Sequence, residues 1–206
     1  MAGYTNFGRS YRLIAGPAGG SGFETTELHI AFSLEKTDLE TSNTARVEMW
    51  NLNDEHKALL KAKNCAVALY AGYGSVMPLV FAGGVSFVST CPDGTDKKTT
   101  IEVEDGLIAT KDTYITLSYS GKVNSKTILD DIAGQMGVAV SYSYNAEFSD
   151  IPNGYSFVGL AKNALSIICN ASNLTWSIQN GVLQIKKPGD VMSQEVFVLS
   201  EETGMI

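Results

Sequence analysis

Two adjacent carboxylates, Asp130 and Asp131, form a pair that could bind a metal ion or act as an acid and a base. They lie in a stretch with helical periodicity, and successive residues of a helix point about 100° apart. The two side chains therefore do not converge on one ligand. Solvated helix surface is the preferred interpretation of this pair.

A second acidic pair, Glu102 and Glu104, lies in a segment that alternates like a strand, with Ile101 and Val103 on the opposite face. Aligned carboxylates on a strand could line a channel. They are also typical of the wet side of a half-buried sheet, which is the interpretation we favour. Glu102 and Glu104 remain candidates for an interface.

Trp50 is a third candidate, because it lies on the polar face of the predicted strand 45–50. Two interpretations stay open. The ring could pack beneath the helix that follows, which we favour, or it could anchor a protein interface, where aromatic residues are enriched.

The other reactive residues lack the partners that a site needs. His29 has no companion in the pattern. The GYG sequence at 72–74 lacks the third glycine and the βαβ context of a phosphate cradle. The sequence contains no P-loop, GxSxG or HExxH motif. We therefore expect a protein that is not an enzyme, with no catalytic, cofactor-binding or metal-binding residues and no cofactor.

Composition excludes several further classes. The 206 residues are 44% hydrophobic and carry a net charge of −7, which repels nucleic-acid backbones and disfavours sequence-specific binding to DNA or RNA. No apolar run approaches the roughly 18 residues of a membrane span, so we expect no stable membrane insertion. The beginning of the chain lacks the apolar core of a signal peptide. Three widely spaced cysteines without a CxxC motif predict reduced, buried thiols and synthesis in the cytosol.

The first half of the chain, residues 1–115, reads as a run of short strands separated by glycine-rich turns, which is typical of a small barrel or sandwich. One short helix interrupts the strands at 53–63. Asn53 is its predicted N-cap, followed by two acidic residues that complement the helix dipole.

Residues 116–186 read as a small α/β domain. The predicted helix 125–136 starts at Asn124 or Ser125 and stops at Gly137, with an inward stripe of Ile128, Leu129, Ile132 and Met136. A second helix is predicted at 160–172. The closing hairpin contains Asn180-Gly181, a strong signal for a type I′ turn.

Residues 187–206 read as a polar linker and one further strand, 195–199. This strand is apolar on both faces, so it needs cover on both sides, and we expect a missing continuation of the chain or a neighbouring subunit to supply it. The interface candidates here are Val196, Phe197, Val198 and Leu199.

The order and spacing of four segments resemble the hub proteins of phage baseplates, a family that includes late-control-type tail proteins and the hubs of contractile injection systems. The first segment is NTARVEMWNLNDEHKALL at 43–60. The second is LVFAGGVSFV at 79–88, followed by TTIEVEDGL at 99–107. The third and fourth are 119–138 and 159–185, which alone also resemble the short α/β domains of secretins and TonB-linked receptors.

This resemblance implies an α+β fold that is mainly β. It places a small N-terminal β-barrel with a short helix first, an inserted α/β domain second, and the start of a second barrel last. It also implies a homotrimeric ring that joins the tail tube or a distal tail protein to a central spike. The protein would then reside in the virion tail or baseplate, after assembly in the host cytoplasm.

Two other hypotheses belong to different classes. A tail enzyme that degrades cell walls would need a convergent set of acidic, Cys/His or metal-binding residues, and the sequence shows none. A receptor- or peptide-binding module of a tail tip or envelope complex would use the α/β domain, and is kept as the alternative.

Overall fold

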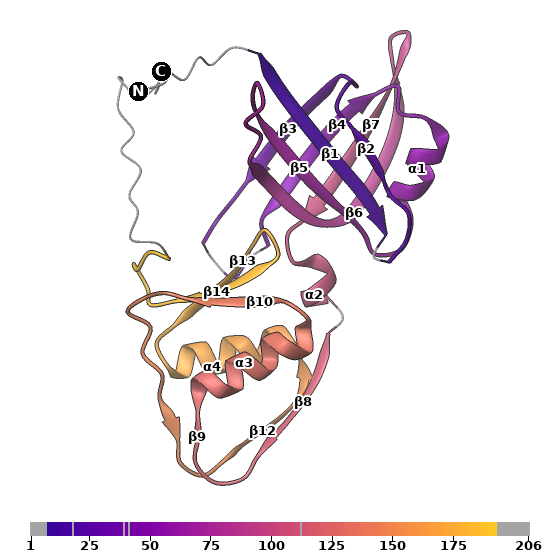
Figure 1. Cartoon of the computed structure of the whole chain (residues 1–206). Helices are drawn as coiled ribbons and strands as arrows, with labels where there is room; N and C mark the ends of the chain where they lie inside the picture. The colour runs from indigo at the N-terminus through magenta and orange to yellow at the C-terminus, as the bar shows by residue number, and fades with distance from the viewer. Residues whose placement is uncertain (1–7, 18, 39, 41, 112, 193–206) are drawn as a thin grey trace, which may run out of the picture.

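The computed structural model describes residues 8–192, apart from residues 18, 39, 41 and 112. Two bodies follow one another along the chain: a curled antiparallel sheet, called the sheet unit, and a smaller α/β unit (Figure 1). The predicted strand 195–199, with the interface candidates Val196, Phe197, Val198 and Leu199, lies outside the described residues.

The sheet unit contains seven strands in the order β2-β1-β5-β6-β7-β4-β3. All its pairings are antiparallel. The strands are β1 (Arg9–Pro17), β2 (Phe23–Thr25), β3 (Ile30–Glu35), β4 (Thr44–Trp50), β5 (Cys65–Tyr73), β6 (Leu79–Asp93) and β7 (Asp96–Glu104).

Strand alternation decides which side chains form the core of the sheet unit. In β4, Ala45, Val47 and Met49 are buried, while the alternate residues Thr44 and Arg46 are exposed. Equivalent inward residues of the other strands, among them Leu69, Phe81 and Ile101, complete one continuous core. The predicted alternation of β4 and β7 is therefore confirmed.

The sheet curls, but its hydrogen-bonded ladder does not close into the barrel that we expected. Among the described strands, β2 and β3 are its two ends. The Tyr11 hydroxyl of β1 donates to the Leu28 carbonyl just before β3, at 2.5 Å. A side-chain hydrogen bond, and not a strand ladder, therefore links β1 to the start of β3. The mainly β α+β class is confirmed, and the barrel is an open one.

Strand β6 runs without a break through the Gly83-Gly84 pair, and its register with β7 shifts between Val85 and Phe87. Gly83 is needed because a Cβ there would lie 2.4 Å from the Glu104 carbonyl oxygen of β7. The glycine thus permits close strand approach without ending the strand.

Helix α1 (Asp54–Leu60) covers β1 and β5 at one end of the sheet unit. Asn53 caps it as predicted, with its side chain accepting a hydrogen bond from the His56 backbone N–H at 2.7 Å. Leu60 is buried, and the His56 ring stacks on Phe23 of β2 at 4.0 Å.

The α/β unit has three layers, with two helices between a three-stranded sheet and short two-stranded ribbons (Figure 1). Its elements are α2 (Leu107–Lys111), β8 (Tyr114–Tyr119), β9 (Val123–Asn124), α3 (Ser125–Met136), β10 (Ala139–Tyr142), β11 (Asp150–Ile151), β12 (Tyr155–Leu160), α4 (Ala161–Ala171), β13 (Thr175–Gln179) and β14 (Val182–Lys186).

The local signals of the α/β unit are confirmed. Asn124 caps α3, and Gly137 ends it in the left-handed conformation, with φ 69°. All four residues of the predicted stripe are buried in a core of their own. The turn residues Asn180 and Gly181 both have positive φ, at 52° and 80°, as a type I′ turn requires.

Five elements were not predicted: the short strands β2, β9 and β11, the strand β12 and the short helix α2. Strand β12 lies directly before helix α4 and includes Leu160, the first residue of the predicted helix 160–172; it pairs with β8 from Tyr155↔Tyr119 to Leu160↔Tyr114. The short helix α2 follows the end of the sheet unit directly. Strand β12 and helix α2 both depend on packing partners that are distant in the sequence.

Candidate functional site on the outer face of the sheet

The candidates Trp50, Glu102 and Glu104 lie on one surface of the sheet unit. Because β4 pairs with β7 from Thr44↔Glu104 to Trp50↔Lys98, the residues between the buried ones project away from the core on both strands. Strand β3 extends this surface on one side and β6 on the other. We call this surface of β3, β4, β7 and β6 the outer face.

Carboxylates exceed cations on the outer face. Its acidic side chains in these strands are Glu35, Glu48, Asp93, Asp96, Glu102 and Glu104, against Arg46 and Lys98. Glu48 accepts from Arg46 at 3.3 Å and lies 3.5 Å from Lys98 Nζ. These pairs are solvent-exposed and of little stabilising value, so the face is defined by its regular rows of polar groups.

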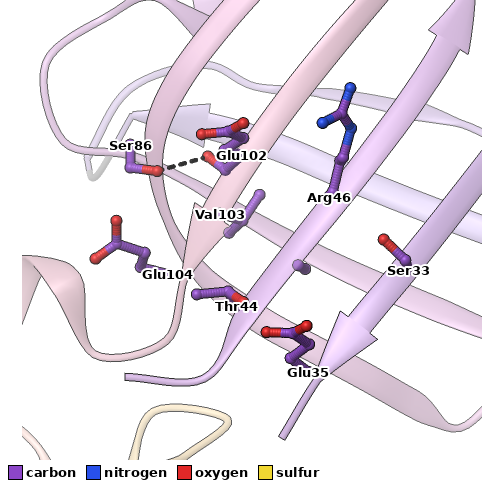
Figure 2. A pocket seen from close by; sticks show the side chains of 9 residues that line it. Ser33, Glu35, Thr44, Arg46, Ser86, Glu102, Val103 and Glu104 are labelled. Atoms are coloured by element: carbon purple, nitrogen blue, oxygen red, sulfur yellow. Dashed lines mark hydrogen bonds between the residues drawn. The ribbon is translucent and has the colours of Figure 1, made fainter. Parts of the chain in front are cut away.

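Glu102 and Glu104 line a shallow hollow of about 350 Å³ with Ser33, Glu35, Thr44, Arg46 and Ser86 (Figure 2). Glu102 is exposed and Glu104 is half-buried. The Ser86 hydroxyl donates to the Glu102 backbone carbonyl at 3.2 Å, which ties β6 to β7 beside the register shift. The hollow is open and polar, and its carboxylates do not form a metal-binding cluster.

Trp50 does not pack beneath α1, contrary to the interpretation that we favoured. Its ring stacks on His29 with centroids 4.3 Å apart, and its indole N–H donates to Asp93 at 2.8 Å. Lys98 Nζ lies 5.9 Å from the ring centroid. These partners belong to the end of the β6–β7 hairpin and to the residue before β3, so Trp50 is a half-exposed aromatic residue within the outer face.

Phe87 is an outer-face residue that sequence reasoning missed. It lies opposite Glu102 in β6 and is 53% exposed. The register shift between Val85 and Phe87 turns an apolar side chain outward, and the sequence marks this only by the preceding Gly83-Gly84 pair.

The carboxylates of Asp130 and Asp131 do not converge, as expected. Asp130 accepts from Lys126 Nζ at 2.8 Å and from the Tyr142 hydroxyl at 2.6 Å, while Asp131 is bound by Tyr119. Burial opposes ionisation of Asp130, but the hydrogen bonds from Lys126 and Tyr142 outweigh it and lower its pKa.

The remaining reactive groups are separate from one another. Cys65 and Cys169 are buried and Cys91 is exposed. Burial raises the pKa of the Cys169 thiol to about 12. Within residues 8–192, leaving out the undescribed positions, no three His, Cys, Asp or Glu side chains are placed to hold a metal ion. No helix in the same residues has the length and apolar character needed to cross a membrane.

Three solved structures share the fold of this chain. The 43 kDa tail protein of prophage MuSo2 from Shewanella oneidensis matches with a TM-score of 0.61 and 14% identity over 86% of this chain and 53% of its own. A tail protein from Neisseria meningitidis matches with a TM-score of 0.55 and 15% identity over 87% of this chain and 50% of its own. A Francisella PdpA–VgrG complex matches with a TM-score of 0.53 and 12% identity over 90% of this chain and 33% of its own.

No family model and no curated protein matches the sequence. The chain spans about half the length, or less, of the structures that it matches. In this chain the mainly β unit precedes the α/β unit, as predicted, and the structural matches extend over most of the chain. This chain therefore has the fold of phage tail proteins.

Proposed function

We propose that this protein is a structural hub at the axis of a phage tail or tail-like particle, where three copies form a ring that joins the tail tube to a central spike. The observation that carries the proposal is the fold shared with two tail proteins over 86% and 87% of the chain. The role is non-enzymatic and needs no cofactor. Its site of action is the virion tail, reached after assembly in the host cytoplasm.

The open edge of the sheet supports assembly between copies. Strand β3 is paired on one side only among the described strands, and its Phe32 is 41% exposed. An unpaired edge of this length invites pairing with another chain. A closed ring of such heterologous contacts would satisfy the edge and fix the number of copies.

The acidic outer face supports a position along the lumen of the ring. Its rows of carboxylates repel a polyanion, so DNA could pass without binding. Trp50 would then lie at the end of the face nearest the β6–β7 hairpin, and Phe87 would lie along β6. A neighbouring tail component could cover both side chains.

Co-expression with the tube and spike proteins of the same tail tests this function. We expect a tagged chain to retain both partners and light scattering to give the mass of three copies per ring. A second arm removes residues 190–206, which should reduce assembly while the near-ultraviolet circular dichroism of the rest is kept. A chain that stays monomeric and retains neither partner would overturn the proposal.

A receptor- or peptide-binding module is the second candidate, favoured by one observation. The α/β unit exposes Tyr114, Tyr144 and Val158 to 73%, 83% and 75%. Tyr114 and Val158 lie on the outward side of the β8–β12 ribbon. Retention of envelope components by the wild type but not by a Tyr114→Ser, Val158→Ser variant would favour this role over the ring.

A further inference from the structure

The sheet unit and the α/β unit have separate hydrophobic cores, and among the described residues no buried residue belongs to both. Besides the contact of α2 with β6, they meet where the tip of the β13–β14 hairpin reaches the ends of β4 and β7 (Figure 1). The contact at the hairpin tip is made largely by buried polar groups. Burial of such groups costs free energy unless they are hydrogen-bonded, so this contact depends on specific pairing.

A buried carboxylate receives the hairpin turn. Asp105, which directly follows β7, is 1% exposed. Its two oxygens accept hydrogen bonds from the backbone N–H groups of Asn180 and Gly181, at 2.5 and 2.9 Å. One side chain therefore satisfies both central N–H groups of the turn.

Asn43, directly before β4, completes the receiving site. It is also 1% exposed, and its amide donates to the Ile178 carbonyl at 3.1 Å and to the Gln179 side chain at 2.9 Å. The backbone carbonyl of Asn43 accepts from the Asp105 N–H at 2.9 Å. We call Asn43 and Asp105 the socket.

The fit around the socket is close. Gly106 has φ 68°, and a Cβ there would lie 2.6 Å from Ile178 Cδ1, so a larger residue would displace the hairpin. Contacts at the rim are exposed and weaker: Lys186 pairs with Asp38 at 2.8 Å, and Lys36 donates to the Asn180 side chain at 3.2 Å.

We propose that the socket is a conformational latch that holds the α/β unit in one orientation on the sheet, and that opening it lets the unit move without unfolding either core. In the closed state every group of the socket is paired, so a shifted orientation would leave buried donors and a buried carboxylate unmet. In the open state water replaces those bonds. Polar interfaces of this kind separate more readily than apolar ones.

Hydrogen exchange and small-angle X-ray scattering on the full chain test the latch with the Asp105→Asn variant. The new amide keeps the size of the side chain but replaces one of the two acceptor oxygens with an NH2 group, so one N–H of the turn loses its acceptor and faces another donor. We expect exchange at the Asn180 and Gly181 amides to accelerate by roughly 10-fold or more. The radius of gyration should rise, while the amides of α3 and β7 keep their protection.

Asp38→Asn is the matched control, because it removes the rim pair with Lys186 and leaves the socket intact. It should behave as the wild type. An Asp38→Cys, Lys186→Cys pair in a Cys91→Ser background, joined by a short flexible cross-linker, should restore wild-type scattering to the Asp105→Asn protein. Unchanged exchange and scattering in Asp105→Asn would overturn the proposal, and so would loss of protection in either core.

Discussion

The two units solve the problem of burial differently. In the sheet unit one side of a curled sheet forms the core, and the other side is left as long, regular rows of exposed residues. In the α/β unit the two helices lie between layers, so the core is covered from both sides (Figure 1). The sheet unit therefore leaves an ordered surface uncovered by its own elements, whereas the α/β unit covers its core from both sides.

The same contrast appears among neighbouring carboxylates. On the outer face Glu102 is exposed and Glu104 half-buried, while Asp105, the residue after Glu104, is buried in the socket. Asp105 lies just past the end of β7 and connects the two units, whereas Glu102 and Glu104 within the strand stay on the outer face.

The largest expected effect is on the core of the sheet unit. Phe81 is 1% exposed, so Phe81→Ala should lower the free energy of unfolding of this unit by about 3–5 kcal/mol. The two tryptophans report separately, Trp50 in the sheet unit and Trp176 in the α/β unit. Urea unfolding followed in single-tryptophan variants should show the shift through Trp50 only. Equal shifts at both would mean that the two cores unfold as one.

A slightly smaller loss is expected in the α/β unit. Ile132 is fully buried on α3, and Ile132→Ala should cost roughly 2–5 kcal/mol, seen through Trp176. Thr127→Ala, at an exposed position of the same helix, is the control. A loss below about half a kcal/mol, the range of ordinary surface changes, would contradict the placement of α3.

The socket predicts a pH dependence of stability. Burial raises the pKa of Asp105, against the opposing hydrogen bonds of the turn. The folded state therefore holds the proton more tightly than the unfolded state, so the contribution of Asp105 is greatest below its unfolded pKa and falls as pH rises through its folded pKa. Urea midpoints should show the stability of the wild type relative to Asp105→Asn decreasing over that window. A difference that grows with pH would contradict the burial of this carboxylate.

The smallest effect on folding is expected at the outer face. Glu102 is exposed and unpaired with a cation at close range in the described residues, so Glu102→Gln should change the free energy of unfolding by no more than about 0.5 kcal/mol. The informative readout is the retention of DNA by assembled rings, which should increase when Glu102 and Glu104 are both neutralised. A substantial loss of folding stability would mean that this face is structural.

Local signals were predictable from the sequence. The caps at Asn53 and Asn124, the stripe on α3 and the Asn180-Gly181 turn each depend on neighbours within a few residues. Their physics is contained in short segments, so the pattern alone was sufficient.

Non-local features were not predictable in the same way. Strand β12 becomes a strand because β8, far earlier in the chain, lies beside it. The partners of Asp105 are backbone N–H groups, which no residue pattern marks. Phe32 pairs with the buried Val47 but is 41% exposed, because β3 is the end of the open sheet.

Cryo-electron microscopy of tail particles that carry this chain tests the central claim most directly. The proposed role predicts three copies arranged around the tail axis, between the tube and the spike, with the outer face of β4 and β7 turned toward the lumen. Density away from the axis, or a particle that assembles completely without the chain, would contradict it.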